Sequence, residues 1–446
     1  MRRLAFLVGV VAGVGGCGKG AGGGKTEPAV KDPVSVVVAP DAAPLAPSEG
    51  DRQGALVEGP VAPAPPAPPA PPAPPPAKPG ADFIDDARRL YQLVACQGRE
   101  PIADDKKRKI VDRHCAWVDK QLGEYRARYI VGARAFFDDI QPDDLPRTVV
   151  YPFGGGDLIS SLAAFPEADE TTTISLELAG DPRRIGALSA LELDESLGRL
   201  RGELGGTLSV GSNTSENLSS SQRNDLPAQV SSFLLGLAAA GFEPVSMRFV
   251  RLADDGAIQY VTAEEIAAAD GRATRARKGD WHDPNFSESF ANVEIEYRKA
   301  GDPADRVRVH RHFGWNLRDR ELDASPQLLR HLEQKGKVTV LVKGASYLLW
   351  RNDFSRIRGY LLANLAWMLS DSTGIPPRFA REAGMVQDTY GRFAGAFLEG
   401  AEASGKKHAD DFRELWAKNK KRRLPFRFGY VDSAKQAHLV VTRPAR

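Results

Sequence analysis

The segment from Tyr151 to Asp157 brings together several residue types that take part in chemistry. It reads Tyr-Pro-Phe-Gly-Gly-Gly-Asp and follows a short apolar run. The glycines Gly154, Gly155 and Gly156 allow backbone amides to face a ligand, and a turn from a strand into a helix is where α/β folds place anion sites. A tight turn closed by Asp157 as a helix cap needs the same residues. The pattern therefore favours a structural turn and keeps a binding or catalytic site as the alternative.

Two residues in the C-terminal half extend that alternative. Lys343 follows an apolar run at residues 338–342, and Asp371 begins the sequence Asp-Ser-Thr-Gly. A lysine behind a buried strand can neutralise a buried acid, and Asp371 is the acid that we match to Lys343. The Asp-Ser-Thr-Gly sequence differs by one residue from the Asp-Thr-Gly of aspartic proteases and occurs once, which favours a capped loop. These two residues, with Tyr151 and Asp157, form a site only if all four meet in one pocket.

His310 and His312 invite a metal-site interpretation, because residues i and i+2 of a strand point to the same side. Pairing with the strand expected at residues 292–298 would place Glu294 opposite His310, as on a charged, solvated sheet face. No third metal ligand lies nearby, so we expect no metal and no cofactor. The chain also contains no Gly-x-Ser-x-Gly, His-Glu-x-x-His or Cys-x-x-Cys motif.

The elements that must position these residues begin with two helices. Residues 82–96 and 104–139 carry apolar residues at helical spacing, and the second segment keeps one apolar seam throughout. Residues 81–145 are therefore predicted to form a helical hairpin whose seam packs on a core, with a protein-binding coiled coil as the alternative.

Residues 146–446 mix helices and strands without a strict βα period, which predicts an α/β or α+β domain with a mixed sheet. We expect hairpins around residues 253–256 and 301–303, and buried helices at 226–240 and 354–369. Further strands are expected at 148–151, 172–178, 338–342, 426–430 and 439–442, and a further helix at 410–418.

The N-terminus has the composition of an export signal. Arg2 and Arg3 precede a short apolar stretch at residues 4–13, which is too short to span a bilayer as a helix. The following Val-Gly-Gly-Cys sequence, which ends at Cys17, resembles the lipobox of bacterial lipoprotein precursors. This resemblance implies lipidation of the Cys17 thiol and cleavage before it, with residues 1–16 as the signal peptide. Ordinary secretion and an uncleaved anchor are the alternatives.

The residue after the cysteine bears on the membrane that is chosen. Gly18 stands where an aspartate would resemble an inner-membrane retention signal. We therefore expect a lipid-anchored cell-envelope protein, with the outer membrane favoured over the inner one. Two or more acyl chains would anchor it stably, whereas a single chain would not.

Residues 17–80 are predicted to be a disordered linker. They are rich in proline and alanine and end in Ala-Pro-Pro repeats between Ala62 and Ala77. Proline fixes φ and removes an amide donor, so this stretch should sample extended polyproline II and join neither a helix nor a sheet. A spacer of this kind holds a folded domain away from the membrane.

Charge and cysteine content limit the remaining interpretations. The 446 residues carry 60 basic and 58 acidic side chains, so no overall field favours nucleic acid. The densest basic run, residues 418–423, fits a solvated helix end or loop, with an anionic lipid or polyanion patch as the alternative.

Cys96 and Cys115 remain after Cys17 is assigned, and an exported protein favours a disulfide between them over two free thiols.

Several phrases of the chain together resemble those of one known family. They are Tyr151-Pro-Phe-Gly-Gly-Gly-Asp157, Lys343-Gly-Ala-Ser-Tyr347, Asp371-Ser-Thr-Gly-Ile-Pro376 and Leu424-Pro-Phe-Arg-Phe-Gly-Tyr430. Their order is similar to that of a family of bacterial exported lipoproteins of uncharacterised activity. The resemblance covers the chain from about residue 148 onward and implies that these phrases belong to one domain.

Two functional hypotheses follow. The first is a non-enzymatic envelope protein that binds a partner or ligand, with the membrane contacted through the N-terminal lipid, an envelope protein as the expected partner, and no nucleic acid. The second is an envelope hydrolase or transferase of unfamiliar type, with its site near the Gly154–Gly156 turn. The absence of the common catalytic motifs favours the first.

Overall fold

The computed structural model describes residues 79–98, 100–208, 226–269, 288–299, 301–303, 306–395, 403–429 and 437–445. Contacts divide the chain at Pro74, and Pro75–Arg446 form one unit. The predicted signal peptide, Cys17 and the predicted linker up to residue 78 lie outside the described residues. No helix of the described part is long and apolar enough to cross a membrane.

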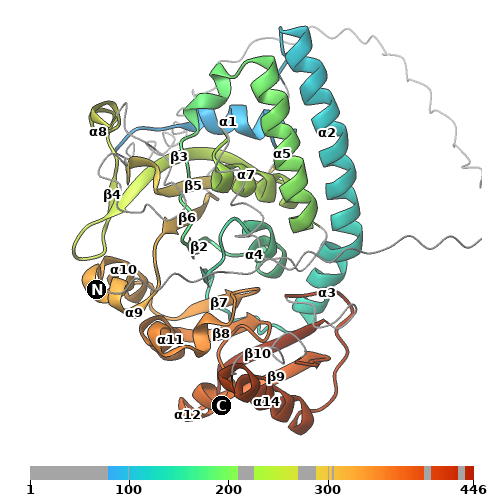
Figure 1. Ribbon diagram of the computed structural model, residues 1–446, viewed down its shortest axis with the longest axis vertical. Helices are drawn as coiled ribbons and strands as arrows, with labels where there is room; N and C mark the ends of the chain where they lie inside the picture. Colours follow the sequence, from blue (N-terminus) through green and yellow to red (C-terminus); the bar gives the residue numbers. More distant parts are fainter. Residues whose placement is uncertain are drawn as a thin grey trace, which may run out of the picture. The chain divides into compact units, whose positions relative to one another are not determined.

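A ten-stranded mixed sheet runs through the unit, in the order β4-β3-β5-β6-β2-β1-β7-β8-β10-β9 (Figure 1). The five central strands, β6-β2-β1-β7-β8, are parallel, and the flanking pairs are antiparallel. The strands are β1 Thr148–Pro152, β2 Glu170–Ser175, β3 Phe242–Leu252, β4 Ile258–Tyr260, β5 Asn292–Lys299, β6 Arg308–Gly314, β7 Val338–Val342, β8 Leu365–Ser370, β9 Met385–Gly391 and β10 His438–Pro444.

Helices cover both faces of this sheet and make a three-layer α/β/α arrangement. One apolar core lies under α1 Ile84–Leu93, α2 Asp105–Tyr125, α3 Val131–Ile140, α4 Leu158–Ala164, α5 Ala190–Leu208 and α7 Ala228–Ala240. The other lies under α9 Asp319–Ala324, α10 Gln327–Glu333, α11 Ser355–Asn364 and α12 Pro377–Glu382. Two further helices are α8 Ala263–Ala268, whose Ile266 belongs to the first core, and α14 Ala403–Lys418, which packs on α12 and β9.

The sequence of the central strands explains why both faces are covered. Val149 and Tyr151 belong to the first core, whereas Val150 between them belongs to the second. Successive side chains of a strand point to opposite faces, so a continuous apolar run needs helices on both sides. The same alternation places Leu341 of β7 in the first core and Val340 in the second.

The predicted helical hairpin packed on a mixed sheet is confirmed. The second helix is continuous through α2, a π-helical turn at Arg126–Ile130 and α3, and α2 lies beside α5 (Figure 1). Arg126 in the π-helical turn donates hydrogen bonds of 2.9 Å to the carbonyl oxygens of Ala238 and Ala239 at the end of α7, where the Ala238 oxygen also accepts one from the Gly241 amide.

Cys96 and Cys115 form a disulfide, with their Cα atoms 5.4 Å apart. Cys96 lies beyond the end of α1 and has a positive φ of 63°. This conformation turns the chain back, so that α2 carries Cys115 past the end of α1. The loop between the helices therefore brings the two cysteines together, and the predicted disulfide is confirmed.

Three sequence predictions about elements were wrong. The helix expected at residues 354–369 ends at Asn364, and Leu365–Ser370 is strand β8. Residues 426–429 form no strand. The charged, solvated face predicted for His310 and His312 is buried, because Phe233 of α7 packs on both imidazoles with ring centroids 4.3 and 5.1 Å away.

The register of the β5–β6 hairpin explains that last error. Glu294 lies opposite Arg311, one residue from the predicted partner, and forms an ion pair with it at 2.8 Å. A shift of one residue moves a side chain to the other face of the sheet. The charged face is therefore the one that carries Arg311, and the histidines point into the first core.

Candidate functional site

The structure brings Tyr151, Asp157 and Lys343 into one buried network. The Tyr151 hydroxyl donates a 2.9 Å hydrogen bond to Oδ2 of Asp157, and Nζ of Lys343 lies 2.7 Å from the same oxygen. Lys343 also donates to Oγ of Ser160 at 2.8 Å. Strands β1 and β7 are neighbours, so the residues that follow them meet at the carboxyl edge of the sheet.

Asp157 does not act as the helix cap that the sequence predicted. It occupies the N-cap position of α4, but its side chain accepts no capping hydrogen bond. The carboxylate instead binds Tyr151 and Lys343 and is about 1% exposed. A buried carboxylate is stabilised more by an ammonium partner than by a capping amide. This explains why Asp157 pairs with Lys343 and does not cap α4.

Asp371 lies at the adjoining strand end, after β8. Its carboxylate accepts hydrogen bonds from the backbone amides of Gly344 at 3.0 Å and Thr373 at 2.8 Å, and from the Thr373 hydroxyl. It therefore links the turn after β7 to the turn after β8. A side chain on Gly429, whose φ is +65°, would collide with this carboxylate.

Electrostatics connect Asp371 to the rest of the network. Burial raises the pKa of Tyr151 well above its ordinary value, and the negative charges of Asp157 and Asp371 raise it further. The four residues selected from the sequence therefore lie in one region, although Asp371 reaches it through the backbone of the Lys343 turn. Whether the region binds or reacts stays a prediction.

Sequence reasoning missed two members of this region. Burial raises the pKa of Tyr125 and Tyr129 well above the ordinary tyrosine value, Asp157 adds to the effect, and hydrogen bonding to Ser160 opposes it. Both tyrosines lie in the apolar seam that the sequence predicts for the long helix, and their hydroxyl groups at a spacing of four residues were the available signal. Tyr129 lies in the π-helical turn, and Tyr125 immediately precedes it.

The Gly154–Gly156 turn is shaped by packing. A Cβ on Gly154 would lie 2.6 Å from the ring of Tyr151, and Gly155 has a φ of 50°. All three glycines are buried. The Gly154 amide serves the turn by donating a 3.2 Å hydrogen bond to the carbonyl oxygen of Tyr151.

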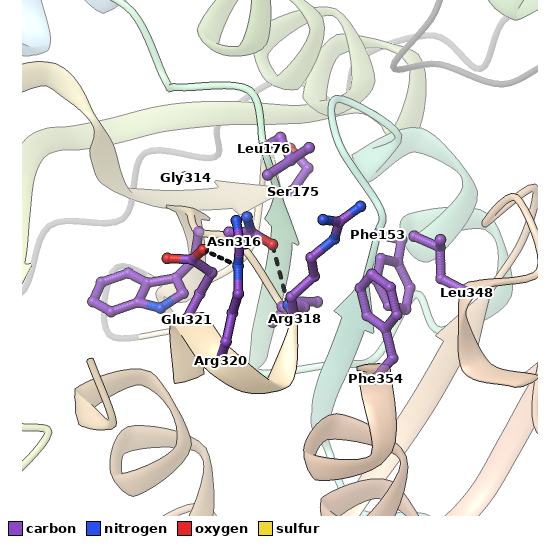
Figure 2. A pocket seen from close by; sticks show the side chains of 12 residues that line it. Phe153, Ser175, Leu176, Gly314, Asn316, Arg318, Arg320, Glu321, Leu348 and Phe354 are labelled. Carbon is purple, nitrogen blue, oxygen red and sulfur yellow. Dashed lines mark hydrogen bonds and ion pairs between the residues drawn. The ribbon is translucent and has the colours of Figure 1, made fainter. Parts of the chain in front are cut away.

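A pocket of about 460 Å³ opens beside this turn, and we call it the sheet-edge pocket (Figure 2). It lies at the carboxyl ends of β1, β2 and β6 and extends to the segment after β7. Its lining consists of Phe153, Ser175, Leu176, Gly314, Trp315, Asn316, Leu317, Arg318, Arg320, Glu321, Leu348 and Phe354.

The position of the sheet-edge pocket follows from the strand order. In the sheet, β2 and β6 lie on one side of β1, and β7 and β8 lie on the other side. The connection that follows β1 leads to β2, whereas the connection that follows β6 crosses to β7, so the two connections diverge between β1 and β7. Open parallel sheets bind ligands at such a switch point, outside the carboxyl ends of the strands. The dinucleotide fingerprint is incomplete here, because Ile159 stands where its third glycine would be.

Phe153 joins the buried network to the sheet-edge pocket. It follows Tyr151 by two residues, lines the pocket and has a φ of 62°, which bulky side chains rarely adopt. Its ring packs edge-on against Phe354, with centroids 5.9 Å apart. Strained backbone of this kind persists where the surrounding structure holds it and concentrates at binding sites.

The polar side of the sheet-edge pocket carries two guanidinium groups. Arg320 forms an ion pair with Glu321 at 2.8 Å, and Nε of Arg318 lies 3.8 Å from Asp353. The side chain of Asn316 holds the loop by accepting a 3.1 Å hydrogen bond from the Arg318 amide (Figure 2). Leu176, on the apolar side, is 49% exposed.

Neither described pocket is lined by Asp157, Ser160 or Lys343. Within the part of the chain that the structure covers, no group of three or more His, Cys, Asp or Glu side chains could hold a metal ion. The geometry therefore favours a structural role for the buried network and a binding role for the sheet-edge pocket. The chain matches no protein-family model, no curated protein sequence and no solved structure.

Proposed function

We propose that this protein is a lipid-anchored cell-envelope protein that binds a small ligand in the sheet-edge pocket. The observation that carries the proposal is the placement of Phe153. Its left-handed backbone directs an aromatic ring into a pocket at the switch point of the parallel sheet. The buried Tyr151–Asp157–Lys343 network supports that backbone from behind.

The lining favours a ligand with an apolar body and a negatively charged end. Phe153, Trp315 and Leu348 form apolar walls, and Arg318 and Arg320 supply the polar groups that would orient the ligand. Arginine suits carboxylate, sulfonate or phosphate groups because its planar fork can donate two parallel hydrogen bonds.

The proposed location rests on the N-terminal sequence and on the cysteines. An export signal ends at Cys17, and the Cys96–Cys115 disulfide suits an oxidising compartment outside the cytosol. Mass spectrometry of the mature protein tests this part. We expect an acylated Cys17 as the first residue, and an intact Met1 or an unmodified Cys17 would contradict the anchor.

A dye with the predicted chemistry tests the pocket. Anilinonaphthalenesulfonate has aromatic rings and one anionic group, and we expect the full-length protein in non-ionic detergent to bind it saturably, with a rise in fluorescence above that of the dye in protein-free micelles. Leu176→Glu puts a charge on the apolar wall and should abolish this binding. Leu191→Glu is the matched control, because Leu191 is 71% exposed on α5 and does not line the pocket. Equal binding by both variants would contradict the proposal.

A second candidate function, an envelope hydrolase or transferase, is favoured by the contact between Ser160 and Lys343. A serine hydroxyl 2.8 Å from a lysine amine is the geometry of a Ser–Lys nucleophile pair. A fluorophosphonate probe separates the two candidates. Labelling that disappears in Ser160→Ala would support the enzyme, whereas the ligand-binding proposal expects no labelling, because Ser160 is buried.

A further inference from the structure

A second concavity, of about 1010 Å³, lies on the other side of β8 from the switch point, and we call it the basic groove. It is bounded by the end of β9, the second half of α14, residues 421–427 and Arg128 of the π-helical turn. Among the residues that the structure describes, seven cationic side chains line it and no acidic side chain does. They are Arg128, Arg392, Arg413, Lys421, Arg422, Arg423 and Arg427.

The positive charge that lines the basic groove is much greater than the net charge of the whole chain. The formal net charge of all 446 residues is only +2, so seven cations without a lining acid form a local field. Like charges held together repel one another, and a bound anion would relieve that repulsion. The basic run at residues 418–423 supplies three of the seven.

The acids around the basic groove neutralise only part of it. Asp388 pairs with Arg422 at 3.0 Å, and Asp410 pairs with Arg413 at 2.8 Å. Glu124 lies 3.6 Å from Arg128.

Four of the seven cations form no ion pair with any residue that the structure describes. They are Arg392, Lys421, Arg423 and Arg427.

Aromatic and aliphatic side chains line the groove between the cations. The rings of Phe393 and Trp416 lie 5.4 Å apart, and Trp416 is held by a 3.3 Å hydrogen bond from its Nε1 to the carbonyl oxygen of Gly391. Leu424 and Pro425 continue this apolar lining. The groove therefore offers a ligand apolar surface as well as positive charge.

We propose that the basic groove binds a molecule that carries two or more phosphate groups. Arginine binds phosphate through paired, charge-assisted hydrogen bonds, and six of the seven lining cations are arginines. The volume lies at the upper end of the range for ligand pockets, about 300–1,000 Å³, so the occupant is larger than a single phosphate ion. A lipid headgroup and a soluble polyphosphate share this chemistry, and the site is independent of the sheet-edge pocket.

Two titrations test this proposal on the full-length protein in non-ionic detergent micelles. Sodium tripolyphosphate supplies a soluble polyphosphate, and cardiolipin, whose headgroup carries two phosphate groups, is mixed into the micelles as the lipid ligand, with phosphatidylcholine as the neutral comparison. Isothermal calorimetry should detect binding that weakens with added salt, since exposed charges are screened. Binding of tripolyphosphate alone supports a soluble ligand, and binding of cardiolipin over phosphatidylcholine supports a lipid one.

Charge-reversal variants localise the effect. Arg423→Glu with Arg427→Glu should weaken the affinity about tenfold or more, as expected for losing charge-assisted contacts. Lys109→Glu with Lys120→Glu on α2 changes the net charge equally, away from the groove, and should leave the affinity unchanged. Unchanged thermal unfolding of both variants shows that they fold. Failure of both titrants to bind, or equal weakening by both variants, would overturn the proposal.

Discussion

Lys343 and Asp157 form a buried ion pair, with 2.7 Å between Nζ and Oδ2, that joins the end of β7 to the start of α4. The pair lies at the switch point of the parallel sheet, between the turn that follows β1 and the turn that follows β7. The pair fixes Tyr151, and therefore the backbone that places Phe153 in the sheet-edge pocket.

Removing one partner of this pair should strongly destabilise the protein. Asp157→Asn leaves the buried Lys343 ammonium without its negative partner, and Lys343→Met leaves the buried Asp157 carboxylate without its positive partner. We expect each variant to lower the free energy of unfolding by about 3–5 kcal/mol. The double variant Asp157→Asn with Lys343→Met should lose less than the sum of the single losses. Urea unfolding measures all three, and additive losses would show that the two side chains do not act together.

Gly429 should tolerate no side chain. Gly429→Ala places a methyl group against the Asp371 carboxylate and forces a non-glycine residue into a φ of +65°, so we expect a loss of about 1–3 kcal/mol in the free energy of unfolding. Gly132→Ala is the control, because a Cβ there meets nothing within 4 Å on a helix. It should gain about 1 kcal/mol. An unchanged free energy of unfolding in Gly429→Ala would show that the Asp371 carboxylate can move away from the added methyl group.

The disulfide should stabilise the fold measurably. Cys96 and Cys115 are 19 residues apart, and closing a loop of this size contributes about 3 kcal/mol in the chain-entropy model. The double variant Cys96→Ala with Cys115→Ala should lower the urea midpoint accordingly. Dithiothreitol should lower the midpoint of the wild type and leave that of the double variant unchanged; sensitivity of both would point to another cause.

Stability should fall as the pH drops from about 6.5 to about 4. Burial is the largest cause that lowers the pKa of five histidines, to about 4 in four cases and well below 6.5 in the fifth. They are His114, His310, His312, His331 and His408. The unfolded chain takes up protons below 6.5 and the folded chain does not, so the stabilisation is complete above 6.5 and is lost through this window.

Urea midpoints across this pH range measure the effect. Each such histidine steepens the dependence of the unfolding free energy on pH by up to about 1.4 kcal/mol per unit. His114→Phe removes one of these groups and should make the slope shallower. A slope that does not change in this variant would show that His114 is protonated in the folded protein.

The sequence by itself determined the local features of this protein. Apolar periods of two and of three to four located β1, β7, α2 and α7, and the turn residues around 253–256 and 301–303 located the β3–β4 and β5–β6 hairpins. The even number of cysteines left after Cys17 predicted the disulfide. These features depend on neighbours within a few residues, or on composition, and a single chain contains that information.

Only the tertiary structure decided which side of each element is buried and which distant residues meet. Residues 365–370 are a short apolar run that fits a helix or a strand, and pairing with β7 and β10 makes them β8. Whether His310 is solvated depends on a register difference of one residue and on the presence of Phe233 above it. The sheet-edge pocket and the basic groove are each lined by residues from separate segments, because long-range strand order, which no local pattern encodes, brings those segments together.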